Sequence, residues 1–171
     1  MKLKVVALTL LASTAITGYA NTALAETCYE AEGSVTTENV TTTLQMGNMS
    51  LMLSNSDDVM VFSESGSLVG NITGADGYGA TLLSHKARFA QGDSFVTNGD
   101  KAVLVFPYIR DYLENGTPCS FFIEETISNI ELGTRFFKNV TSVRVTANGH
   151  ISNCPNDNEN YFELSGTLCV E

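Results

Sequence analysis

The chain has 171 residues, of which 43% are hydrophobic and 16% charged, and its formal net charge is −10. This composition excludes general disorder and supplies enough apolar material for one packed core. The negative charge repels phosphate backbones and anionic lipid surfaces, so we expect neither nucleic-acid binding nor attachment to such membranes.

The N-terminal segment has the composition of a cleavable secretory signal peptide. Two lysines precede an apolar run over residues 5–16, and Ala23-Leu24-Ala25 supplies a small-residue cleavage motif. The apolar run is too short to be a stable membrane anchor. We therefore predict a signal peptide over residues 1–25 and a single mature domain over residues 26–171, either periplasmic or secreted.

The mature chain consists of short segments of alternating apolar and polar residues, separated by Gly, Asn, Asp and Ser. This pattern is typical of an all-β domain. The expected strands are, in chain order, Cys28–Thr36, Met49–Ser54, Val59–Ser63, Ser67–Thr73, Tyr78–Ala90, Ser94–Thr97, Lys101–Phe106, Cys119–Ile130, Thr141–Ser152 and Tyr161–Val170.

Residues 107–115 fit two different structures. Pro107 suits the first position of a short helix, with Gly116 just past its end. Alternatively, Asn115-Gly116 is the turn of a hairpin between two strands. The sequence favours neither over the other.

The first and last strands match when they are paired antiparallel with Cys28 opposite Cys169. A slip by one residue would destroy this match of apolar residues. A first strand beside the last strand closes the sheet, so we predict an all-β, closed antiparallel barrel of about eight strands with little helix. The matched inward pairs are Tyr29 with Leu168, Ala31 with Gly166, Gly33 with Leu164, and Val35 with Phe162.

The four cysteines of an exported protein are expected to form disulfides. The register above places Cys28 beside Cys169, and a similar alignment of two later strands brings Cys119 close to Cys154. We therefore predict these two bridges. The spacing of the cysteines and histidines does not suit zinc, and we expect no metal and no other cofactor.

Two ionisable residues lie on apolar strand faces. His85 alternates with Leu83, and Glu125 alternates with Phe121. Buried ionisable groups need partners, so both are candidates for ligand contact, or for acid–base catalysis if they lie close together. A structural polar pair in the core is the alternative. Phe121 and Tyr29 also point inward and complete the candidate ligand-cavity residues.

Several acidic residues occupy turns, but none forms a calcium-binding loop with its distal glutamate. We expect them to be solvated on the surface. These residues are Asp57, Asp58, Asp76, Asp93, Asp100, Asp157 and Glu159.

The turn Leu132-Gly133-Thr134-Arg135-Phe136-Phe137 follows the apolar segment Phe121–Ile127 and precedes a last strand that contains Gly166-Thr167. Together these segments resemble the C-terminal half of the allene oxide cyclase and dirigent-protein barrels, in which a strand leads to a Gly-Thr-Gly-x-Phe turn. Arg135 and Ser142 stand where that family usually has glycines. The resemblance implies a barrel with a hydrophobic cavity. Plant members cyclise an unsaturated epoxide or guide radical coupling, but no functional residue of the family can be placed here.

Two functions are consistent with these observations. The first is a non-enzymatic, disulfide-stabilised exported barrel that binds a small apolar ligand or serves a structural role. The alternative is a cyclase or isomerase-type enzyme that uses His85 and Glu125 as acid and base in the barrel cavity. Whether the protein is an enzyme stays open at the level of sequence.

Overall fold

The computed structural model describes residues 26–171, which form one antiparallel sheet of ten strands and a short 3₁₀ helix, η1 (Arg135–Asn139). The prediction of an all-β domain with little helix is therefore confirmed. The predicted signal peptide lies outside the described residues. The strands are β1 (Thr27–Asn39), β2 (Leu44–Ser54), β3 (Met60–Ala75), β4 (Thr81–Phe89), β5 (Ser94–Thr97), β6 (Asp100–Tyr112), β7 (Pro118–Ile127), β8 (Ile130–Thr134), β9 (Val140–Ser152) and β10 (Glu159–Val170).

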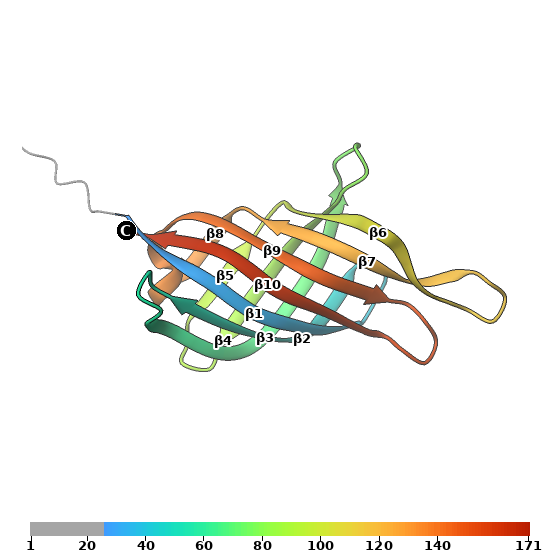
Figure 1. Cartoon of the computed structure of the whole chain (residues 1–171), viewed down its shortest axis with the longest axis horizontal. Helices are drawn as coiled ribbons and strands as arrows, with labels where there is room; N and C mark the ends of the chain where they lie inside the picture. Colours follow the sequence, from blue (N-terminus) through green and yellow to red (C-terminus); the bar gives the residue numbers. More distant parts are fainter. Residues whose placement is uncertain (1–25) are drawn as a thin grey trace, which may run out of the picture.

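Eight of the strands form a ring (Figure 1). Their order around it is β1, β10, β9, β7, β6, β4, β3, β2 and back to β1. The first residues of β4 pair with β6, whereas its last residues pair with β5, which in turn pairs with β8. β5 and β8 therefore extend the sheet beyond the ring.

The first and last strands pair in the predicted register. Cys28 lies opposite Cys169, Ala31 opposite Gly166, and so on along both strands. Because the apolar side chains of β1 and β10 meet on the inner face only in this register, burial of that face fixes the pairing.

Both predicted disulfides are present. Cys28–Cys169 joins β1 to β10 with a Cα–Cα separation of 4.0 Å, and Cys119–Cys154 joins the start of β7 to the loop after β9, with a separation of 5.0 Å. The two bridges lie at opposite ends of the ring. They fit an oxidising, extracytoplasmic environment.

The expected separation of the strands Val59–Ser63 and Ser67–Thr73 is wrong, because β3 runs unbroken from Met60 to Ala75. Gly66 pairs with Phe89 of β4, and a Cβ atom added to it would lie 2.1 Å from the carbonyl oxygen of Arg88. This glycine therefore permits a close approach of two strands and does not mark a turn.

The hairpin alternative for residues 107–115 is correct and the helical one is wrong. β6 continues to Tyr112, and the Gly116 amide donates to the Leu113 carbonyl oxygen at 2.9 Å. Gly116 has φ of +80°, a left-handed conformation that glycine adopts without a Cβ clash.

The predicted strand Cys119–Ile130 is divided in the structure. β7 ends at Ile127, and β8 begins at Ile130 and pairs with β5 instead of β9. η1 follows β8 directly and turns two phenylalanines toward the interior of the ring.

We call the end of the ring that contains η1 the closed end. Phe137 of η1 is only 1% exposed and lies among several other aromatic rings. Its neighbour Phe136 donates its backbone amide to the Asp93 carboxylate at 2.9 Å, which fixes the position of η1. The rings within 6 Å of Phe137 are those of Phe62, Phe89, Phe95 and Phe136.

We call the opposite end the mouth. The β6–β7 and β9–β10 hairpins project from it, and the Cys119–Cys154 bridge links them (Figure 1). The first residue of β1 and the last of β10 lie at the closed end, so the mouth is remote from both ends of the described chain.

Candidate functional site

A cavity of about 310 Å³ opens at the mouth. Its volume falls within the range of small-molecule sites, and its lining is mostly apolar, as such sites usually are. The lining residues are Gln45, Ile72, Gly79, Thr81, Leu83, Ala102, Leu104, Phe121, Ile123, Glu125, Ile151 and Phe162.

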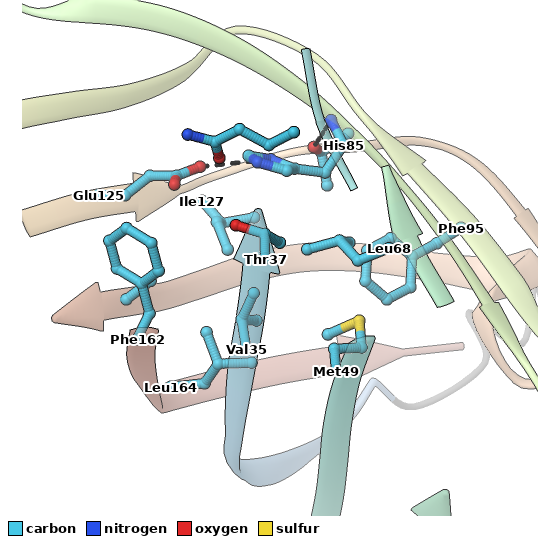
Figure 2. Close-up of a pocket in the computed structure, with 13 residues that line it drawn as sticks. Val35, Thr37, Met49, Leu68, His85, Phe95, Glu125, Ile127, Phe162 and Leu164 are labelled. Atoms are coloured by element: carbon cyan, nitrogen blue, oxygen red, sulfur yellow. Dashed lines mark hydrogen bonds and ion pairs between the residues drawn. The ribbon is translucent and has the colours of Figure 1, made fainter. Parts of the chain in front are cut away.

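A second, inner cavity of about 40 Å³ shares Gln45, Glu125 and Phe162 with the mouth cavity. It has room only for water-sized molecules. Figure 2 shows its polar groups gathered on one side, around His85 and Glu125, above apolar side chains. Glu125 therefore lies where the two cavities adjoin.

His85 of β4 lies inside the ring because Gly70, its partner on β3, leaves space for the imidazole. A Cβ atom at Gly70 would lie 3.0 Å from both Cδ2 and Nε2 of that ring. His85 is 9% exposed. A buried imidazole needs hydrogen-bond partners, and the neighbouring strands provide them.

Asp100, at the start of β6, holds the His85 ring. The Asp100 carboxylate is completely buried, and its Oδ2 lies 2.9 Å from Nδ1 of His85. The Thr97 hydroxyl donates to the same oxygen, and it accepts the His85 backbone amide at 3.0 Å. The turn between β5 and β6 therefore fixes the imidazole through both its ring and its backbone.

Glu125 of β7 approaches the same ring nitrogen from the other side. Its Oε1 lies 3.3 Å from Nδ1 of His85, and a dashed line marks this contact in Figure 2. Because Nδ1 carries a single proton and the Asp100 oxygen is closer, the interaction with Glu125 is mainly electrostatic. Oε1 of Glu125 and Oδ1 of Asp100 are buried without a hydrogen-bond partner among the described residues.

These contacts shift the protonation equilibria of two groups. Burial lowers the pKa of His85, but the hydrogen bond to Asp100 and the charges of Glu125 and Asp100 outweigh it, so the pKa lies above its ordinary 6.5. Burial raises the pKa of Glu125 above its ordinary 4.5; the charge of Asp100 adds to this rise and that of His85 opposes it. Both groups therefore hold their protons more tightly than they would in water.

The cluster of His85, Asp100 and Glu125 combines donors that serve two kinds of chemistry. An imidazole oriented by one carboxylate and placed beside another can transfer protons to and from a bound molecule. The ligand atoms of the three residues also lie within 4.8 Å of one another, so they could hold a small divalent cation.

Of the residues predicted to line a ligand cavity, the structure places three around the two adjoining cavities. His85 and Glu125 are in contact, and Phe121 lines the mouth cavity. Tyr29 lies at the closed end, where its ring packs 5.6 Å from that of Phe136, and it lines neither of the two cavities.

Three further site residues were not identified from sequence: Asp100, Thr97 and Gln45. The expectation that Asp93 and Asp100 are solvated in turns is wrong, because both are buried and accept hydrogen bonds. Strand alternation does indicate that Asp100 points inward, because it lies two residues from the cavity-lining Ala102 and so shares its face of the strand.

Comparison with known proteins gives no relative. The chain matches no family model, no curated protein and no solved structure. Within residues 26–171, no helix is long and apolar enough to cross a membrane.

Proposed function

We propose that this protein is an exported β-barrel that binds a small apolar molecule in its mouth cavity. The observation that carries the proposal is the apolar cavity of about 310 Å³ with Glu125 at its inner limit. Sites for small molecules typically combine such an apolar wall with a few polar groups that orient the ligand. The ring of eight strands supports the barrel, and the two disulfides support export.

The interior is hollow at the mouth, where the cavity of about 310 Å³ lies, and this supports binding rather than a purely structural role. The aromatic cluster at the closed end fills the interior there, whereas the mouth keeps its volume. A domain with only a structural role gains nothing from an unfilled apolar cavity, because the missing van der Waals contacts reduce its stability.

The neutral, apolar fluorophore N-phenyl-1-naphthylamine tests this proposal. Its emission should rise on binding to the protein, and the substitution Ala102→Phe, which fills the mouth cavity, should abolish that rise. Val103→Phe is the matched control, because Val103 is the next residue of β6, is 37% exposed and is absent from the cavity lining. Equal emission from both variants would place the bound dye elsewhere and contradict the proposal.

A second candidate function is an isomerase or cyclase that works by acid–base chemistry. The specific observation in its favour is the contact of His85 with Asp100 and Glu125 beside a ligand-sized cavity. The resemblance to allene oxide cyclases supports the same class of reaction. For this candidate, a bound substrate analogue with an acidic C–H bond should exchange its hydrogen with D₂O, and His85→Gln should stop the exchange. No exchange above the rate in buffer would leave only the binding function.

A further inference from the structure

The polar cluster beside the mouth cavity contains two carboxylates but only one imidazole. Oδ2 of Asp100 accepts from the Thr97 hydroxyl and also lies within hydrogen-bond distance of Nδ1 of His85. The single proton on Nδ1 cannot serve Glu125 equally well, because Asp100 lies at 2.9 Å and Glu125 at 3.3 Å. Asp100 thus has donors on one of its two oxygens, whereas Oε1 of Glu125 has only the longer electrostatic contact with His85.

Glu125 is placed to obtain a donor from a ligand. It is only 6% exposed, its Oε1 has no hydrogen-bond partner among the described residues, and it lines both cavities. An unpaired buried carboxylate is costly, since it has lost its hydration without replacement. A donor bound in the mouth cavity would remove this cost.

The other polar groups around the mouth cavity also favour a donor. The Gln45 amide nitrogen donates to Oδ1 of Asn39 at 3.1 Å, and the Gln45 carbonyl oxygen can accept from a ligand in the mouth cavity, which Gln45 lines together with Glu125. Among residues 26–171, no lysine or arginine lines the cavity, and the formal charge of the whole chain is −10. An anionic ligand would meet repulsion, whereas a cation would be attracted both at long range and at Glu125.

We infer that the mouth cavity binds an apolar amine, whose protonated nitrogen donates to Glu125 and whose hydrocarbon part fills the apolar wall. This inference rests on the proposed binding function and specifies the chemical class of its ligand. A charged donor is favoured over a hydroxyl, because an ammonium group adds to the hydrogen bond a Coulomb attraction to the Glu125 carboxylate that a hydroxyl lacks.

Three ligands of equal chain length test the inference: n-hexylamine, n-hexanol and hexanoate. Each is titrated against the full mature protein at pH 7, with displacement of N-phenyl-1-naphthylamine as the readout. Prior dialysis against EDTA keeps divalent cations away from the cluster. We expect hexylamine to bind at least about tenfold more tightly than hexanol, and hexanoate to bind most weakly.

Two variants make the test specific. Glu125→Gln keeps the shape of the side chain but loses its charge, and it should reduce the preference for amine over alcohol to about twofold or less. Glu124→Gln is the matched control, since it removes the same charge from the adjacent residue, whose side chain points to the opposite face of β7. That variant should keep the wild-type preference.

Each outcome separates the inference from the function on which it rests. If the dye and all three ligands fail to bind, both are overturned. If the dye binds but hexanol or hexanoate equals hexylamine, the binding function stands and the amine inference is wrong. This second comparison needs only wild-type protein, so it holds even if Glu125→Gln does not fold. Retention of the amine preference by a folded Glu125→Gln variant would also overturn the inference.

Discussion

The closed end and the mouth are built from the same strands but fill the interior in opposite ways. At the closed end, η1 inserts Phe137 among four other aromatic rings, and the cavity beside Phe95 there measures only about 30 Å³. At the mouth, the wall is apolar, the cavity is open, and three ionisable residues lie together at its inner limit. The difference indicates that packing at the closed end stabilises the fold, whereas the mouth keeps buried ionisable groups that lower the free energy of unfolding.

Such a division has a physical basis. Burying His85, Asp100 and Glu125 is unfavourable unless each charge finds a partner, and one oxygen of each carboxylate has none within the described protein. Aromatic packing and burial at the closed end supply free energy that offsets this cost. Four predictions test whether the two ends differ in this way.

The largest effect is expected from the disulfides. Cys28–Cys169 closes a loop with a sequence separation of 141, and Cys119–Cys154 closes one of 35. In the chain-entropy model, the double substitution Cys28→Ala/Cys169→Ala should lower the free energy of unfolding by about 5 kcal/mol and Cys119→Ala/Cys154→Ala by about 4 kcal/mol. Urea denaturation of both double variants measures this, and a larger loss from the mouth bridge would reverse the expected order.

The next effect compares one phenylalanine at each end. Phe137→Ala removes a completely buried ring and should cost about 3–5 kcal/mol. Phe121→Ala at the mouth should cost only about 1–2 kcal/mol, because its ring borders an open cavity and is already partly exposed. Equal losses in urea denaturation would mean that the mouth is packed as tightly as the closed end.

A smaller effect is expected where the polar cluster touches β3. Gly70→Ala would place a methyl group 3.0 Å from the His85 ring, so the ring must move at a cost of about 1–3 kcal/mol. Gly74→Ala on the same strand is the control, since an added methyl group meets nothing within 4 Å there. The chemical shifts of the His85 ring should change only in the first variant. An unchanged ring in Gly70→Ala would show that Gly70 is not what accommodates the imidazole.

The smallest effect is the pH dependence contributed by the cluster. A pKa that is higher in the folded than in the unfolded protein gives stability that is present at low pH and is lost as the pH rises through the folded value. His85 should therefore stabilise the fold below pH 6.5, and this contribution should be lost as the pH rises above 6.5. Glu125 should likewise stabilise the fold below pH 4.5, and its contribution should be lost as the pH rises above 4.5.

Difference curves isolate these two contributions from the rest of the titration. The unfolding free energy of wild type minus that of His85→Gln should decline above pH 6.5. His150→Gln serves as the opposite case, because burial lowers the pKa of His150 and its contribution should therefore rise with pH. A flat or rising difference curve for His85→Gln would contradict the direction of the shift.

The features that sequence predicted well are those fixed by alternation along paired strands. The Cys28–Cys169 register and the inward positions of His85 and Glu125 all follow from which residues share a face. Alternation is a local property of each strand, so the sequence shows it without knowledge of the rest of the fold.

Alternation does not give the position of a residue along the axis of the ring. Tyr29 and Phe121 both point inward, yet they lie at opposite ends, and only Phe121 borders a cavity. Asp100 was missed for a related reason, since a carboxylate beside Asn98-Gly99 resembles a solvated turn until β4 is known to pass next to it. The partners of a buried charge come from distant strands, and a single sequence does not specify which strands those are.

The placement of the two ends of the described chain has a practical consequence for orientation. Both Thr27 and Val170 lie beside the closed end, so a tag, fusion partner or tether joined at either terminus would extend away from the cavity entrance. A molecule held to a surface through either terminus would thus present its entrance outward, accessible to solutes, and immobilisation for binding measurements should use the termini and avoid the projecting hairpins.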